Sequence, residues 1–239
     1  MSSRVVVLFK GGRLPAWHQL SDEERSEFEQ THVDLMLSVA HQHAMTRLEG
    51  FRLIGPQGDW QRFWLIEFPT IQGAEAWMRA EMAPPYGLYG HYEYLLSRPL
   101  QAERYAAWAT RPIPPIVQRS KDPHTIPALQ IDPSSIVVLI FARYRSGAEA
   151  LTAEQRGDAE HIALMQEIAR EHGLMRLEGF QLLTPQADWH RAWIIELPTL
   201  EAAEAWVAGE EAPPHGIHAR RKIYLARKWA PEYFASWSQ

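Results

Sequence analysis

The chain contains one pattern of residues twice, and this internal repeat limits the folds that it can adopt more than any other feature. Residues 43–87 match residues 172–216 without a gap, and 26 of these 45 positions are identical. The stretch RLEGF occurs at 47–51 and again at 176–180, so equivalent residues lie 129 positions apart. A match of this length indicates a duplicated domain.

A proline-rich stretch separates the two copies. Residues 109–133 contain six prolines, which remove backbone donors and favour an extended chain over a helix or a central strand. We therefore predict three parts: a first ferredoxin-like repeat over residues 1–108, a connector over 109–133, and a second ferredoxin-like repeat over 134–239.

Each copy shows the same order of predicted elements. A β-branched run at 5–9, or at 136–141 in the second copy, predicts a strand. A helix follows, with one face formed by His32, Leu35, Met36, Val39 and His43. Strands at 48–54 and 62–68, a helix capped by Thr70, and a last strand at 92–96 complete the copy. The order β-α-β-β-α-β is that of a ferredoxin-like fold, so the fold class is α+β.

The two predicted sheets need a cover, because the helices of such a repeat lie on one face only. The strand at 62–68 is apolar at nearly every position, which is typical of a strand buried on both sides. We therefore expect the repeats to pack sheet against sheet as an intramolecular pseudo-dimeric α+β barrel. The alternative is that each repeat pairs with a second chain, so the protein is either a monomer with pseudo-dimeric repeats or a homodimer.

The composition argues against several classes of protein. A formal net charge of -5 and a pI near 6.1 argue against a nucleic-acid surface, which needs clustered positive charge. The chain has no cysteine, which excludes disulfides, thiol nucleophiles and cysteine-bound zinc. The apolar run at 5–9 is too short for a signal-peptide core or a membrane span. We therefore expect a cytoplasmic protein that binds a small organic molecule and neither nucleic acid nor membrane.

Two matching segments carry a family resemblance. The stretches GDWQRFWLIEFPTIQGAEAW (58–77) and ADWHRAWIIELPTLEAAEAW (187–206) resemble the signature of a small, mostly uncharacterised family in the dimeric α+β barrel superfamily. In that family a Glu-Phe-Pro-Ser/Thr segment precedes a short helix and a turn that bears a tyrosine. The resemblance implies a ferredoxin-like dimeric barrel with a small-molecule pocket. The wider superfamily includes cofactor-free monooxygenases, muconolactone isomerases, haem-using peroxidases and chlorite dismutases. The second copy departs from the family pattern, because His215 stands where the turn tyrosine belongs.

Histidines on the first helix of each copy are the leading candidates for catalysis. His32 and His161 lie on the stripe that is expected to face the sheet, where an imidazole acts as a base or as a ligand. His43 and His172 lie eleven residues further along, or about 16 Å away on a helix, so they cannot share one substrate atom with the first pair. Their position at the helix end suits capping or packing.

Polar and aromatic side chains on the strands complete the candidate set. Arg62 and Arg191 are expected to stabilise an anion. Glu67 and Glu196 lie in apolar strands, where a carboxylate needs a partner, so they either bind ligand or pair with the recurrent arginines. The other candidate ligand-binding residues, of which the tryptophans also suit core packing, are Trp64, Trp193, Tyr86, His215 and His218.

No metal and no cofactor are expected from the motifs. His215 and His218 stand three residues apart without a third ligand at a characteristic spacing. The chain also lacks a phosphate-binding loop and a dinucleotide fingerprint.

The expected function is cofactor-independent oxygenation or isomerisation of a hydrophobic organic substrate. His32 or His161 serves as the base in this interpretation, and Arg62 or Arg191 stabilises the developing anion. Two alternatives stay open: a non-catalytic small-ligand-binding or structural protein of the same fold, and a haem-binding protein in which a histidine faces an open cavity.

Overall fold

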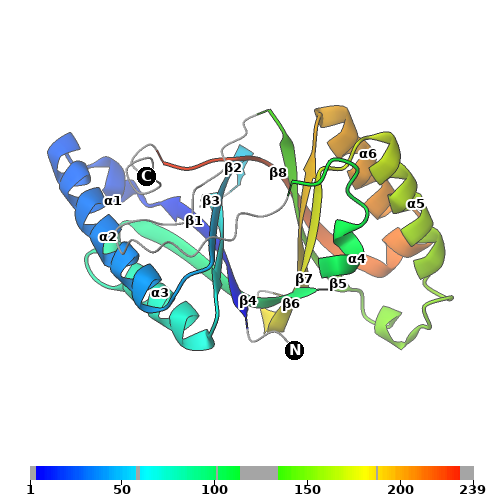
Figure 1. The fold of residues 1–239 in the computed structure, drawn as a ribbon, viewed down its shortest axis with the longest axis horizontal. Helices are drawn as coiled ribbons and strands as arrows, with labels where there is room; N and C mark the ends of the chain where they lie inside the picture. Colours follow the sequence, from blue (N-terminus) through cyan, green and yellow to red (C-terminus); the bar gives the residue numbers. More distant parts are fainter. Residues whose placement is uncertain (1–3, 58–59, 101, 114–133, 187, 232–239) are drawn as a thin grey trace. The chain divides into compact units, whose positions relative to one another are not determined.

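The computed structural model describes residues 4–57, 60–100, 102–113, 134–186 and 188–231 (Figure 1). These residues form two compact units. The first unit contains the described residues between 4 and 97 together with 228–231, and the second contains those between 98 and 113 and between 134 and 227. Most of the predicted connector, residues 114–133, lies outside the described residues.

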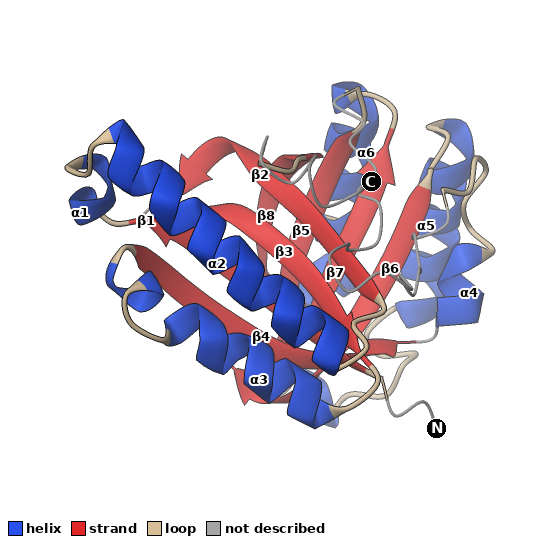
Figure 2. Ribbon diagram, turned by 60° about the vertical axis from the view of Figure 1, so that its left-hand side comes forward, coloured by secondary structure: helices blue, strands red, loops and turns tan. Residues whose placement is uncertain are grey.

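The first unit is a four-stranded antiparallel sheet with helices on one face (Figure 2). Its strand order is β4-β1-β3-β2, and α2 packs beside α3. The elements are β1 (Val5–Arg13), α1 (Pro15–His18), α2 (Asp22–Gln42), β2 (Arg47–Gln57), β3 (Trp60–Phe68), α3 (Ile71–Met82), the 3-10 turn η1 (Tyr86–Leu88) and β4 (Gly90–Leu100).

The second unit has the same element order and the strand order β8-β5-β7-β6. A short helix that follows β4 in the chain, α4 (Ala102–Ala106), contacts β6 of this unit. The other elements are β5 (Ile136–Tyr144), η2 (Ala148–Ala150), α5 (Asp158–Glu171), β6 (Arg176–Gln186), β7 (Trp189–Leu197), α6 (Leu200–Glu211), η3 (His215–His218) and β8 (Ala219–Lys228). The predicted α+β class is confirmed, with four antiparallel strands in each unit.

Local sequence explains where the helices begin and end. Ser21 forms a capping box with Glu24 at the start of α2, which satisfies backbone donors that the first turn leaves free. Thr70 caps α3 by accepting a hydrogen bond from the backbone N–H of Gly73, as predicted. His43 is the C-cap residue of α2, so the expected position of this histidine at a helix end is confirmed.

The repeated RLEGF stretch has a packing reason. Gly50 lies opposite Trp64 in the β2–β3 register, and Gly179 lies opposite Trp193 in the β6–β7 register. A Cβ atom on Gly50 would lie 2.6 Å from Cζ3 of Trp64, and one on Gly179 would lie 2.4 Å from Cζ3 of Trp193. Because an added Cβ atom would overlap the tryptophan ring at either position, only glycine allows this close contact between the ring and the neighbouring strand.

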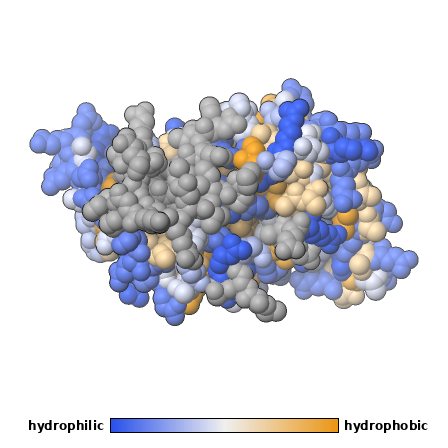
Figure 3. All heavy atoms as spheres, viewed as in Figure 1, coloured by the Kyte–Doolittle hydropathy of each residue, from blue (hydrophilic) through white to orange (hydrophobic). Residues whose placement is uncertain are grey.

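Each unit has its own apolar core between sheet and helices. In the first unit Val5, Val7 and Phe9 of β1 pack with Met36 of α2, and in the second Ile136, Val138 and Ile140 of β5 pack with Met165 of α5. The outer side chains of α1 and α2 are mostly hydrophilic (Figure 3). Among the described residues no helix combines the length and the apolar character needed to cross a membrane.

Candidate functional site

A cavity lies between the sheet and the helices in each unit, and the two cavities have matching frames. His32 on α2, Arg62 and Trp64 on β3 and Glu81 on α3 line the first cavity. The residues 129 positions later line the second, and these are His161, Arg191, Trp193 and Glu210. The volumes differ greatly, at about 60 Å³ in the first unit and about 520 Å³ in the second. The same scaffold therefore carries a nearly filled cavity in one copy and an open one in the other.

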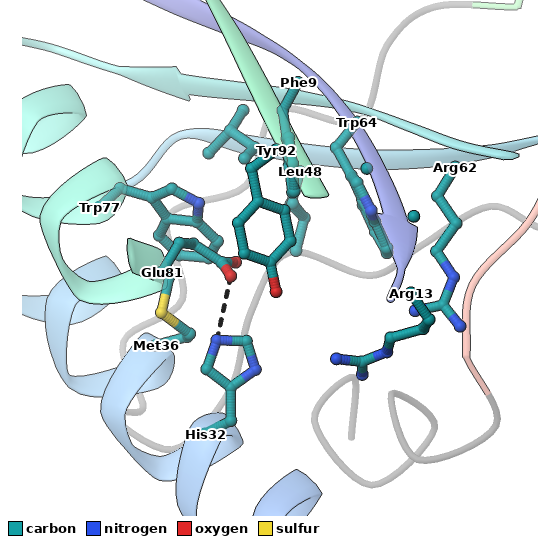
Figure 4. Close-up of a pocket in the computed structure, with 13 residues that line it drawn as sticks. Phe9, Arg13, His32, Met36, Leu48, Arg62, Trp64, Trp77, Glu81 and Tyr92 are labelled. Carbon is teal, nitrogen blue, oxygen red and sulfur yellow. Dashed lines mark ion pairs between the residues drawn. The ribbon is translucent and has the colours of Figure 1, made fainter. Parts of the chain in front are cut away.

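Aromatic side chains fill the first cavity. The Tyr86 ring lies against the His32 ring with centroids 4.6 Å apart, and Tyr94 stacks on Phe9 at 4.8 Å. Tyr92 projects between Glu81 and Trp64 (Figure 4). This explains why so little space remains in the first unit.

Smaller or more polar side chains occupy the equivalent positions of the second unit. His215 replaces Tyr86, Arg221 replaces Tyr92, and Ile223 replaces Tyr94. Ile140 takes the place of Phe9, because each pairs with the equivalent tryptophan on the neighbouring strand. These exchanges replace three rings by non-aromatic side chains and one by an imidazole, and the second cavity has the larger volume.

Two stacked histidines form one wall of the second cavity. The rings of His161 and His215 lie 4.1 Å apart at an interplanar angle of 14°. Nδ1 of His215 is 3.1 Å from Oδ1 of Asp158, and Nε2 of His161 is 3.9 Å from Oε2 of Glu210. Nδ1 of His161 is buried and has no hydrogen-bond partner within the described part of the chain.

Burial keeps both imidazoles uncharged at neutral pH. It lowers the pKa of His161 to about 4, and the neighbouring His215 and Arg221 act in the same direction. Burial also lowers the pKa of His215, against the opposing effect of Asp158. A neutral imidazole offers a nitrogen lone pair without first losing a proton, so this wall provides a ligand for a metal or a hydrogen-bond acceptor.

Two ion pairs support the histidine wall. Nε of Arg221 donates to Oε2 of Glu210 at 2.9 Å, and burial raises the pKa of Glu210 although Arg221 opposes it. Arg156 pairs with Asp158 at 2.8 Å. Burial raises the pKa of Asp158, but the bonds from Arg156 and His215 outweigh it, so this pKa lies below its usual range.

The second cavity has charged and aromatic walls. Among the described residues, five arginines and three carboxylates line it, and the carboxylates are those of Glu149, Asp158 and Glu210. Tyr105, in the segment that joins β4 to the connector, meets Trp193 edge to face at 4.9 Å. Trp108 and Arg104 of the same segment also line the cavity. This environment suits a flat, partly apolar ligand that bears negative charge.

The structure brings most of the predicted site residues to the cavities. His32, Arg62 and Trp64 line the first, with Tyr86 against His32. The second has four such residues on its wall, which are His161, Arg191, Trp193 and His215.

Three predicted residues lie elsewhere. Glu67 and Glu196 are buried away from both cavities, where Oε1 of Glu67 accepts from Thr46 at 2.9 Å and Oε1 of Glu196 accepts from Ser135 at 2.8 Å. These partners are hydroxyl groups, whereas the structural alternative expected the recurrent arginines. His218 ends η3 outside the cavity wall, and its carbonyl accepts from the backbone N–H of Arg145. Within the described residues, no group of three or more histidine and acidic side chains is placed to hold a metal ion.

Sequence reasoning missed several residues of the second cavity. Glu81 and Glu210 recur at the 129-residue spacing, and this recurrence was a signal that could have identified them. Arg221 has no such signal, because its counterpart is Tyr92, whereas Asp158 corresponds to another acidic residue, Glu29. The contribution of Tyr105 was also missed, since this residue lies near the end of the predicted first repeat but packs in the second unit.

No protein-family model matches the sequence, and no curated protein sequence matches it. Solved structures of chlorite dismutase from Candidatus Nitrospira defluvii are similar in fold. An arginine-to-lysine mutant aligns with a TM-score of 0.69 at 13% identity over 100% of this chain and 96% of that one. The imidazole complex aligns with a TM-score of 0.67 at 12% identity over the same shares. A mutant in complex with cyanide aligns with a TM-score of 0.65 at 14% identity over 96% and 92%. These proteins belong to the dimeric α+β barrel superfamily, and this chain has a similar mixed α+β fold.

Proposed function

We propose that the second unit binds haem in its 520 Å³ cavity, with His161 as the iron ligand. The observation that carries the proposal is a neutral, largely buried imidazole, that of His161, on the wall of a large cavity. The fold shared with chlorite dismutase supports it. Haem binding was one of the alternatives that the sequence left open.

The cavity fits haem in size and chemistry. Its volume of about 520 Å³ lies within the range of about 300–1,000 Å³ that is typical of small-molecule sites. Haem is flat and apolar with carboxylate groups at one edge, which matches the aromatic walls and the arginine side chains of this cavity. In contrast, the first cavity has about 60 Å³ and cannot hold haem.

Each residue has a distinct role in this proposal. His161 would ligate the iron, and Glu210 would orient its ring through the second nitrogen. Arg191 would bind a haem carboxylate, with its guanidinium steadied over the Tyr144 ring at 5.7 Å. When bound, haem supplies iron-based redox chemistry. The protein contributes the ligand, the charge that binds the carboxylates and the exclusion of water.

Cofactor-independent oxygenation or isomerisation of a hydrophobic substrate is the second candidate for the same cavity. In this case His161 would accept a proton and Arg191 would stabilise the resulting anion. General bases work best with a pKa near the working pH. The pKa of His161 is about 4, so this imidazole is a weak proton acceptor but an available metal ligand. The low pKa of His161 therefore favours haem binding over acid–base catalysis in this cavity.

Two further points belong to the proposal. We propose that the two repeats pack sheet against sheet as a pseudo-dimeric barrel, which the fold shared with chlorite dismutase supports. The cytoplasm as location, and a monomer or homodimer as the assembly, stay predictions from the sequence. A purely binding role without turnover also stays open, and the experiment below separates it from catalysis.

The test is haem titration of the purified protein, followed by its visible absorption. Wild-type protein is expected to develop a shifted Soret band at one equivalent of haem. His161→Gly should lose that spectrum and regain it with added imidazole, because imidazole replaces the missing ligand. His32→Gly, the matched change in the first unit, should behave as wild type.

Two results would overturn the haem proposal. One is the absence of saturable binding to wild-type protein. The other is a spectrum that survives His161→Gly but changes in His32→Gly. Tight haem binding without peroxide or chlorite turnover would assign a binding role rather than a catalytic one.

A further inference from the structure

Three polar residues of the second cavity have no part in the proposed haem site, although they form one connected series of contacts. They are Arg156, Asp158 and His215, and all three line the cavity. His215 begins η3, whereas Asp158 begins α5, the helix that carries His161. The series ends on His161, so its effect is expected there.

One guanidinium holds both oxygens of Asp158. Nε of Arg156 donates to Oδ1 at 3.2 Å, and Nη2 donates to Oδ2 at 2.8 Å. Arg156 also donates to the backbone carbonyl of Leu151, so the arginine is itself anchored. Two parallel bonds fix the plane of a carboxylate as well as its position. The Asp158 carboxylate is therefore oriented before it meets His215.

Asp158 in turn determines which nitrogen of His215 carries the proton. Oδ1 of Asp158 is 3.1 Å from Nδ1 of His215. Burial raises the pKa of Asp158, but the bonds from Arg156 and His215 hold it below its usual range, so the carboxylate is ionised and can only accept. Nδ1 of His215 must then donate, and Nε2 keeps its lone pair. The ring is thus held in one tautomer and one orientation.

His215 passes this order to His161 by stacking. The two rings are 4.1 Å apart and only 14° from parallel, and both side chains are largely buried. Nε2 of His161 is 3.9 Å from Oε2 of Glu210, which is beyond hydrogen-bond distance. Glu210 therefore acts on the His161 ring by charge alone, and the stack with His215 is left to fix the plane of the ring.

The first copy has different residues at all three positions. Tyr86 takes the place of His215, and its ring is tilted by 31° against that of His32. Glu27 stands where Arg156 stands in the second copy, so an acidic residue replaces the arginine that orients the carboxylate. The ordered pair of imidazoles therefore belongs to the unit with the larger cavity.

We infer that His215 is a positioning residue, which holds the ring of His161 in the orientation that binds iron. Arg156 and Asp158 hold His215 in turn. The inference rests on the proposed haem site for its purpose, but the order of the two rings is a property of the protein without haem. Changes at position 215 should therefore alter His161 in the haem-free protein and the ligation of haem in the complex.

Imidazole NMR of the full-length, haem-free protein is the first measurement. With ¹⁵N-labelled histidine, the two rings are identified by the signals lost in His161→Gly and His215→Leu. Wild-type His215 should carry its proton on Nδ1 at neutral pH, and His161 should titrate near pH 4. Burial is the main cause of this low pKa of His161. The pKa should nevertheless rise in His215→Leu, because a neighbouring imidazolium no longer opposes protonation.

Haem titration is the second measurement. His215→Leu should weaken haem binding by about ten- to a hundredfold, the effect typical of losing a residue that orients a metal ligand. Its Soret band should broaden, because His161 then adopts more than one orientation. His215→Phe keeps a flat ring against His161 without the bond to Asp158, so it should lose less affinity. Tyr86→Leu, the matched change in the first unit, should leave haem binding and the His161 titration unchanged.

The two proposals fail in different ways. Wild-type protein that binds no haem would refute the haem site, whereas a raised pKa of His161 in His215→Leu would still support His215 as the residue that orders His161. An unchanged His161 titration in His215→Leu protein of wild-type melting temperature would refute the positioning role. Unchanged haem affinity in the same variant would also refute it. The same comparisons with His215→Phe decide the question if His215→Leu does not fold.

Discussion

Replacing Arg221 by methionine probes the charge balance of the second cavity. Arg221 and Glu210 form a 2.9 Å ion pair, and their side chains are only 6% and 16% exposed. Removing the arginine leaves a carboxylate in a partly buried site without its cation. Breaking a buried pair in this way costs about 3–5 kcal/mol of stability.

Protonation of Glu210 limits the loss of stability that Arg221→Met can cause. A carboxyl of ordinary pKa near 4.3 can be neutralised at pH 7 for about 3.7 kcal/mol, and at pH 5 for about 1 kcal/mol. The folded-state pKa of Glu210 is raised by burial, and loss of Arg221 raises it further. The protonated form is therefore favoured in the folded state, so the penalty is small at low pH and grows as the pH rises.

Urea denaturation of wild type and Arg221→Met at pH 5 and pH 7 measures the effect. We expect a loss of about 3–4 kcal/mol at pH 7 and about 2 kcal/mol less at pH 5. The double variant Glu210→Gln with Arg221→Met should recover stability at pH 7 and lose the extra pH dependence. An equal loss at both pH values would show that Glu210 does not remain as an uncompensated charge, and the electrostatic reasoning would fail.

Two further predictions concern the same unit. His161 has a folded pKa of about 4 against an unfolded value near 6.5, so stability should fall by up to about 3 kcal/mol as the pH drops from 6.5 to 4. His161→Leu should remove that part of the loss in urea denaturation, and an unchanged pH profile would contradict the buried neutral imidazole. Gly179→Ala places a Cβ atom 2.4 Å from the Trp193 ring and should cost about 1–3 kcal/mol by overpacking. Gly55→Ala, where an added Cβ has no atom within 4 Å, is its control in thermal unfolding and should show no such loss.

The fold could be predicted because its signals are local or periodic. The 129-residue repeat, the apolar strands and the Thr70 cap are all visible in short stretches of sequence, and each reflects backbone geometry that neighbouring residues impose. The repeated histidines, arginines and tryptophans could be expected to line a cavity, because each lies on the face of its helix or strand that was predicted to be covered. The volume of each cavity could not be predicted in this way.

Side-chain volume and charge at a cavity depend on residues that meet only after folding. The histidine at position 215 already differed visibly from Tyr86, but its stacking on His161 required α5 and η3 to come together. The pairing of Arg221 with Glu210 joins β8 to α6, and Tyr105 contacts Trp193 from the end of the predicted first repeat. The repeat thus establishes two cavities with similar walls, while contacts between distant segments nearly fill one cavity and leave the other open. The reason is that the free space inside a packed domain is the volume that its converging side chains do not occupy.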